Sequence, residues 1–111
     1  MKLAEEKALL RIHLSNHLKR HGAPLYEAIV ERARREGIAG ATVLAGRSGY
    51  VGNGPLLGSH SSTERPVIVE LVDDAEVLDS FLRLVSPLLS GQPVLITWER
   101  AQIVRHGGPL A

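Results

Sequence analysis

The sequence contains no cysteine, and only 4% of its 111 residues are aromatic. The missing cysteines exclude disulfide bonds, thiol catalysis and cysteine-ligated zinc, and they fit a reducing compartment. The scarcity of aromatic rings leaves little surface on which nucleic-acid bases could stack. A formal net charge of +1 gives no strong field toward nucleic acid or a membrane surface. We therefore expect no nucleic-acid partner.

Long hydrophobic runs are also absent. No stretch approaches the ~18 apolar residues of a membrane helix, and the first seven residues carry acidic side chains where a signal peptide would be apolar. The remaining composition, with 44% hydrophobic residues, is that of a globular protein long enough to bury a core. We expect one cytoplasmic domain over residues 1–111, frayed at 1–7 and 107–111.

Hydrophobic periodicity divides the chain into six regular elements. Leu10, Ile12 and Leu14 alternate with polar residues, which predicts a half-buried strand. Apolar residues at helical spacing predict two helices, the second capped by Asp73 or Asp74. The first half of the chain is predicted to form a strand at 8–15, a polar connection, a helix at 24–36 and a strand from 40 that fades by 51. An unstructured loop follows at 49–64. The second half is predicted to form a strand at 66–72, a helix that Pro87 ends or kinks, and a strand from 93 or 94 through 98 that continues at 103–106.

This βαββαβ order predicts an α+β, ferredoxin-like fold. Right-handed crossovers place both helices on one face of a four-stranded antiparallel sheet. The second helix has a predicted buried stripe formed by Val77, Leu78, Phe81, Leu82, Val85, Leu88 and Leu89.

The predicted strand at 66–72 is apolar on both faces apart from Glu70. Antiparallel strands with one solvated face normally alternate, so the second face needs cover that a single small domain lacks. This pattern predicts self-association, with Val69 or Leu71 pointing away from the helices. The alternative is a surface strand with a few exposed apolar residues.

Residues 21–43 read HGAPLYEAIVERARREGIAGATV, a helix with a proline at its start, a glycine stop and the beginning of a strand. This run resembles the P-II-like family known as domain of unknown function 190, and residues 37–43 also resemble the Gly-x-x-Gly-x-Thr-Val segment of P-II signalling proteins. The resemblance is strong over residues 9–51 and weak elsewhere. It independently implies the ferredoxin-like fold, and it implies a homotrimer whose sheets pack toward the threefold axis.

The resemblance also implies a ligand site between subunits. Gly40, Thr42 and Gly49 would border a nucleotide cleft, with Arg47 at the base of the loop. Glycines at 49–54 could turn backbone N–H groups toward a phosphate, although they could equally serve only to make a tight, mobile loop.

A second part of the implied site precedes and follows the last strand. Gly91 and Gln92 occupy the position of a phosphate-gripping loop, and Arg105 matches a late arginine of P-II proteins. Gln92 stands where the P-II lysine is expected, which weakens the case for tight ATP binding. Arg105 could equally be an exposed charge at the end of a strand.

Catalytic and metal patterns are weak. His13, His17 and His21 lack zinc-ligand spacing with a carboxylate or cysteine, and His21 is better explained by the turn before the first helix. His60 lies near serines without a nucleophile elbow. The acylphosphatase pattern, which the same fold can carry, is incomplete. We expect no enzyme activity, no bound metal and no required cofactor.

The sequence therefore predicts a P-II-like regulatory protein. A homotrimer would bind a small anionic ligand, with ATP, ADP or AMP as the candidates. The 49–64 loop, a T-loop in P-II terms, would become ordered and contact a protein target. The target is unknown; a membrane transporter is one candidate, because some relatives occur alongside membrane ion exporters. The alternatives are a ligand-free trimeric interaction module and a small-molecule or metal-handling trimer.

Overall fold

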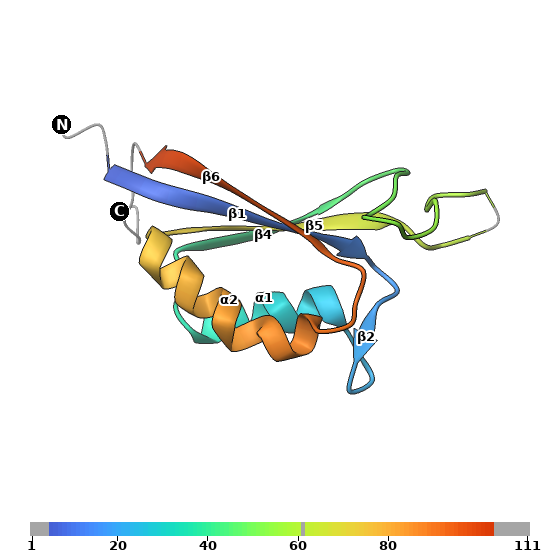
Figure 1. Ribbon diagram of the computed structural model, residues 1–111, viewed down its shortest axis with the longest axis horizontal. Helices are drawn as coiled ribbons and strands as arrows, with labels where there is room; N and C mark the ends of the chain where they lie inside the picture. Colours follow the sequence, from blue (N-terminus) through green and yellow to red (C-terminus); the bar gives the residue numbers. More distant parts are fainter. Residues whose placement is uncertain (1–4, 61, 104–111) are drawn as a thin grey trace, which may run out of the picture.

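The computed structural model describes residues 5–60 and 62–103. Two helices and four main strands form the body, and two very short strands form a separate hairpin (Figure 1). In chain order these are β1 (Glu5–Ser15), β2 (Lys19–Arg20), β3 (Ala23–Pro24), α1 (Leu25–Arg35), β4 (Gly40–Ala45), β5 (Pro66–Asp73), α2 (Ala75–Leu89) and β6 (Leu95–Ile103).

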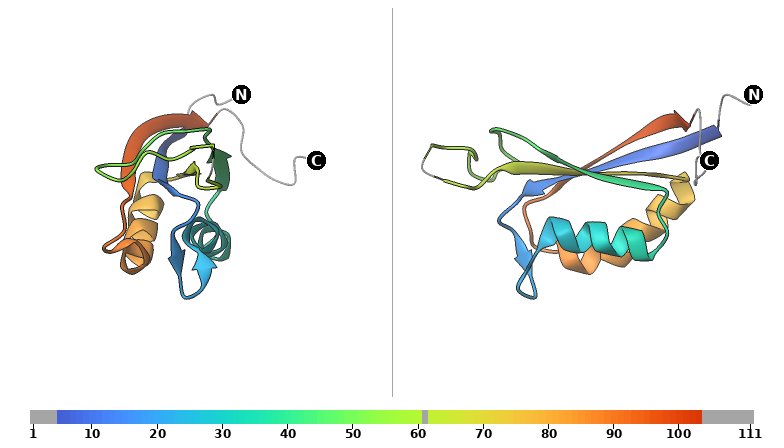
Figure 2. Two further views of the ribbon diagram at one scale, coloured as in Figure 1. Left: turned by 90° about the vertical axis from the view of Figure 1, so that its right-hand side faces the viewer. Right: turned by 180° about the vertical axis from the view of Figure 1, so that it is seen from behind.

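The main sheet has the strand order β4-β5-β1-β6, and all of its pairings are antiparallel. Both helices lie on one face of it, as the end-on view in Figure 2 shows. The predicted α+β, ferredoxin-like arrangement is therefore confirmed. β4 and β6 are the two edges of the sheet, and the loop that joins β4 to β5 projects at the end opposite the start of β1 (Figure 1).

The core lies between the sheet and the helices, and the alternation of β1 determines which side chains enter it. Leu10 and Ile12 of β1 are fully buried. They pair with Leu71 and Val69 of β5, which are also fully buried. The expectation that Val69 or Leu71 points outward is therefore wrong, because both share the pleat of the core residues. The β5 residues on the opposite face are Ile68, Glu70 and Val72.

The glycine stops behave as predicted. After α1, Gly37 has a φ of +76°, and the Ile38 N–H donates to the Ala33 carbonyl at 3.0 Å while the Gly37 N–H donates to Arg34. This is the Schellman arrangement, which only a residue tolerant of positive φ closes easily. Gly91 follows α2 with the same φ of +76°.

Several boundaries differ from the sequence prediction. β1 begins at Glu5, β4 ends at Ala45, and β6 runs without interruption from Leu95 to Ile103, whereas residues 104–106 lie outside the described residues. Pro87 sits inside the last turn of α2, which continues to Leu89. Val77 is 39% exposed and does not belong to the buried stripe.

Candidate functional site

The loop between β4 and β5 is folded, contrary to the expectation of sixteen unstructured residues. Gly49 and Leu57 form an isolated β-bridge, with N–H to carbonyl distances of 3.2 and 2.8 Å. The Gly54 N–H donates to the Val51 carbonyl at 2.9 Å, which closes a turn at the tip. Residues 49–57 therefore form a small hairpin, called the loop hairpin below.

One face of the loop hairpin packs against the body of the protein. Val51 and Leu57 are 7% and 5% exposed. They share a small cavity of about 40 Å³ with Ser15 at the end of β1, with Leu18, which follows β1, and with Pro93, which precedes β6. These apolar contacts, which the sequence pattern did not reveal, hold the loop hairpin beside the turn at residues 91–93.

The chain returning to β5 is fixed by a polar cluster. Asn16 donates its N–H to the Arg65 carbonyl at 3.0 Å, and its side-chain oxygen accepts the Arg65 N–H at 2.8 Å. Ser15 donates to the Glu64 carboxylate at 2.8 Å, and a ring nitrogen of His17 lies 3.0 Å from the Thr63 hydroxyl oxygen. Residues 62–65 are therefore anchored to the end of β1.

The β2–β3 hairpin holds the end of α2, just before the turn at residues 91–92. His21 and Gly22 link the two strands with φ values of +51° and +80°, as a type I′ turn requires. Arg20 then reaches α2, where its guanidinium donates to the carbonyls of Leu88 (2.9 Å) and Ser90 (2.5 Å). A cation at this point also interacts favourably with the negative end of the helix.

The predicted site residues fall into two groups within one chain. Arg47 and Gly49 follow β4, and Gly91 and Gln92 precede β6, so all four lie at the loop end of the sheet. Gly40 and Thr42 lie farther along β4, where they pair with Val72 and Glu70. Arg105 lies outside the described residues. Sequence reasoning missed Asn16 and Glu64, which fix the chain that returns to β5, and Arg20, which fixes the end of α2.

The face of the sheet that points away from the helices, called the open face below, has a charged centre. Arg11 donates to Glu70 at 2.9 Å and to Glu99 at 2.8 Å across three neighbouring strands. These two hydrogen bonds raise the pKa of Arg11. Leu44 and Leu95, on the two edge strands, are 45% and 48% exposed beside this network. The open face is therefore partly apolar and partly charged.

His13 also lies on the open face and makes it sensitive to acid. Burial lowers the pKa of His13, and the Arg11 guanidinium lowers it further. Because the folded pKa is below the unfolded value of about 6.5, protonation favours the unfolded chain. We expect stability to fall as the pH drops below about 6.5, and His13→Gln to reduce this loss in urea titrations. An unchanged pH profile in the variant would contradict this assignment.

Among the described residues, no group of three or more histidine, aspartate or glutamate side chains is placed to hold a metal ion. Within the same residues, no helix is both long and apolar enough to cross a membrane.

The chain matches a known protein family over most of its length. The family model DUF190, described as "Uncharacterized ACR", matches residues 7–103. The chain belongs to the DUF190 family. A relative of this DUF190 member, the UPF0166 protein of Aquifex aeolicus (strain VF5), is 33% identical over 103 residues, which cover 89% of this chain and 94% of that protein.

Solved structures with the same fold are PII-like proteins. CPII, a nitrogen regulatory PII-like protein from Thiomonas intermedia K12 bound to ADP, AMP and bicarbonate, matches with a TM-score of 0.71 and 17% identity over 91% of each chain. A PII-like protein from Thermus thermophilus matches with a TM-score of 0.68 and 21% identity over 95% of each chain. At these identities the likeness shows that this DUF190 member has the PII-like fold.

Proposed function

We propose that this DUF190 protein is a cytoplasmic, non-enzymatic regulator. In this proposal it forms a homotrimer, binds an adenine nucleotide in clefts between subunits, and contacts a protein target through the 49–64 loop. The observation that carries the proposal is the placement of Arg47, Gly49, Gly91 and Gln92 together at the loop end of the sheet, in a chain of the PII-like fold.

The strand order supports a site shared between copies. Gly40 and Thr42 belong to β4, whereas Gly91 and Gln92 precede β6, and β5 and β1 separate these two edge strands. Residues on opposite edges of one sheet can share a cleft when the β4 edge of one copy lies beside the β6 end of another. The open face supplies apolar contacts for such an assembly through Leu44 and Leu95.

An adenine nucleotide is the ligand proposed because CPII, of the same fold, was solved with ADP and AMP. Arg47 is exposed at the base of the loop, where a guanidinium can pair with phosphate oxygens. Gly91 has a positive φ and no atom within 4 Å of an added Cβ, so its backbone is approachable. The backbone of Gly49 pairs with Leu57, and a ligand that used its N–H would have to open that bridge. Gln92 contributes a neutral amide where the P-II lysine would add a charge, so we expect modest affinity.

The folded loop hairpin limits the kind of conformational change that the proposed switch can use. The Gly49–Leu57 bridge and the turn closed by Val51 and Gly54 hold residues 49–57 together, so binding at Arg47 and Gly49 would displace the loop hairpin as a unit rather than fold it. Its movement would separate Val51 and Leu57 from Pro93 and present a changed surface to the target.

Replacing Arg47 with alanine is expected to weaken nucleotide binding by roughly 10- to 150-fold. A charge-assisted hydrogen bond contributes about 1.5–3 kcal/mol, which converts to that range of dissociation constants. Calorimetry of wild type and Arg47→Ala with ATP, ADP and AMP measures the effect. Arg83→Ala, which removes an exposed arginine from α2, is the matched control and should bind like wild type.

Two results would contradict the proposal in different ways. If wild type binds none of the three nucleotides at millimolar concentration, the nucleotide assignment fails. If it binds and Arg47→Ala binds equally well, the ligand class stands and the assignment of Arg47 is wrong.

A second candidate function is a trimeric interaction module that needs no ligand. Gln92 favours this candidate, because the phosphate-gripping cation expected of a P-II protein is missing there. A stable trimer without nucleotide affinity would select it.

A further inference from the structure

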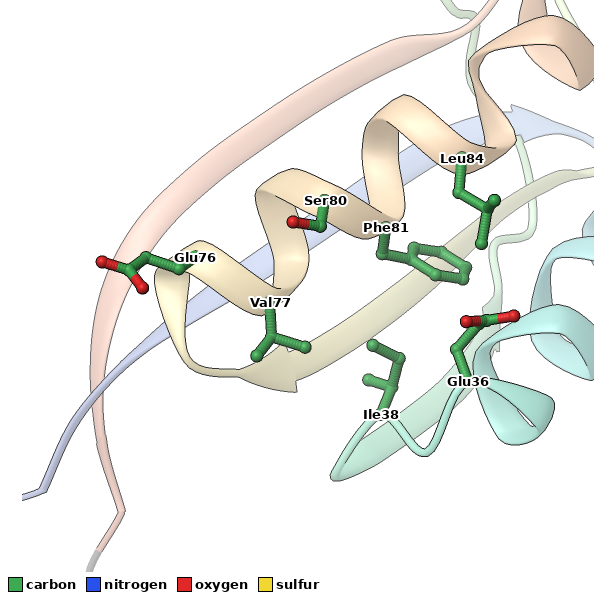
Figure 3. A pocket seen from close by; sticks show the side chains of 7 residues that line it. All are labelled: Glu36, Ile38, Glu76, Val77, Ser80, Phe81 and Leu84. Carbon is green, nitrogen blue, oxygen red and sulfur yellow. The ribbon is translucent and has the colours of Figure 1, made fainter.

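A groove runs along the helix layer, on the side of the protein opposite the open face. It has a volume of about 520 Å³ and lies between α2 and the turn that links α1 to β4 (Figure 3). Its lining consists of Glu36, Ile38, Glu76, Val77, Ser80, Phe81 and Leu84. The candidate ligand residues do not contribute to it.

The apolar wall of the groove is a second stripe on α2. Val77, Phe81 and Leu84 follow one another at four- and three-residue spacing, which places them on one side of the helix. Phe81 forms the floor at 2% exposed, and Val77 and Leu84 stand above it at 39% and 40% exposed. Figure 3 shows Val77 and Phe81 facing Ile38 across the groove, with Leu84 farther along the helix on the side of Glu36.

A backbone hydrogen bond fixes the position of Ile38. The hydrogen bond from the Ile38 N–H to the Ala33 carbonyl turns the chain back after α1 and places Ile38 against the core. The opposite wall is therefore formed by a turn that backbone hydrogen bonds hold in place.

The ionisable residues in the lining, Glu36 and Glu76, are both acidic. Glu76 lies in the first turn of α2, and Glu36 lies beside Phe81 at the end of α1 (Figure 3). Glu36 accepts a hydrogen bond from Arg32 at 3.0 Å, but this pair is exposed, and such pairs are readily exchanged. The groove thus combines an apolar floor with acidic ends.

We propose that the helix groove binds an amphipathic helix of a partner protein. The occupant has apolar residues at i, i+4 and i+7, which pack against Val77, Phe81 and Leu84 as one helix packs on another. Lysine or arginine residues at its ends lie near Glu36 and Glu76. The open face lies on the other side of the sheet, so contacts that the proposed trimer makes through the open face leave this groove uncovered.

The test uses the full chain and a synthetic helical peptide of about 14 residues. The peptide carries leucines at i, i+4 and i+7, lysines near both ends and alanines elsewhere, and a second peptide has glutamates in place of the lysines. Amide chemical shifts of the nitrogen-15-labelled protein locate the binding site, and titration gives both affinities. We expect shifts around Ile38, Val77 and Leu84, and binding of the lysine peptide that is at least about tenfold tighter.

Two variants separate the groove from nonspecific apolar contact. Leu84→Asp and Ser80→Arg both change exposed positions of α2, so each should keep its fold, and each should weaken the lysine peptide by about tenfold or more. Leu56→Asp changes a residue that is 77% exposed on the loop hairpin and should bind like wild type. Shifts outside the groove, equal binding of the two peptides, or full affinity in both groove variants would overturn the proposal.

Discussion

Replacing Ile68 with lysine is expected to dissociate the proposed trimer into folded subunits, whereas replacing its neighbour Val69 with lysine is expected to unfold the subunit. The two residues are adjacent on β5 and point to opposite faces. Val69 is fully buried among core residues, so a lysine there loses its apolar contacts and buries an unpaired charge. That combination costs more than about 4 kcal/mol, a large part of the 5–15 kcal/mol typical of a domain.

Ile68 is half-buried on the open face, where it pairs with His13 and Leu44. A lysine at this position can remain solvated in a single subunit but not in a closely packed assembly of sheets. Light scattering gives the mass of each variant, and circular dichroism reports its fold. Leu56→Asp is the control for the loss of an exposed apolar residue and should keep the wild-type mass. A monomeric wild type would end the trimer proposal.

Replacing Gly58 with alanine is expected to detach the loop hairpin while the sheet stays folded. Gly58 has a φ of +96°, and a Cβ atom there would lie 2.3 Å from the Arg47 carbonyl oxygen and 2.8 Å from two carbon atoms of Ser48. The conformation alone costs about 1–3 kcal/mol for a residue other than glycine. The overlap is with the backbone at the start of the loop, so the two arms must move apart.

Amide exchange of Gly49 and Leu57 measures this opening, and we expect it to accelerate by roughly 10- to 100-fold. Gly52→Ala is the matched control, because Gly52 also has a positive φ (+56°) but no atom within 4 Å of the added Cβ. The control should show a smaller change. If both variants exchange alike, the close crossing at Gly58 does not hold the loop hairpin.

The elements that sequence reasoning predicted well are those set by local patterns. Alternation in β1 identified Leu10, Ile12 and Leu14 as core residues, and helical spacing together with Gly37 located α1 to within a residue at each end. These patterns act through neighbours in the chain, so one sequence is enough to read them.

The features that were missed depend on residues far apart in the sequence. Arg20 reaches carbonyls at Leu88 and Ser90, and Asn16 pairs with Arg65, so neither contact has a local signature. The loop hairpin has no local signature, because Val51 and Leu57 stand among glycines, a proline and other apolar residues without regular spacing. Their burial follows from the position of Pro93, which only the folded chain brings near.

The face assignment in β5 failed for a different reason. Because Ile68, Val69, Leu71 and Val72 are all apolar, the strand contains too little alternation to indicate which pleat faces the helices. Val69 pairs with Ile12 of the neighbouring strand β1, and this pairing places Val69 on the face that packs against the helices. The pairing of β4 with β5 places Thr42 beside Glu70 on the open face, away from the ligand candidates at the loop end.

The two anchors of the long loop have a short turn between them, across which the Gly58 N–H donates to the Glu64 carbonyl and the Ser62 N–H donates to the Ser59 carbonyl. The loop hairpin is held by Val51 and Leu57, and residues 62–65 are held by Ser15 and Asn16, so the chain near Ser59 and His60 lies between two fixed ends. Insertions, deletions or grafted recognition sequences at that point would alter neither anchor. During divergence within the family, or in a laboratory redesign, such a segment can acquire new target specificity while the scaffold and its assembly remain the same.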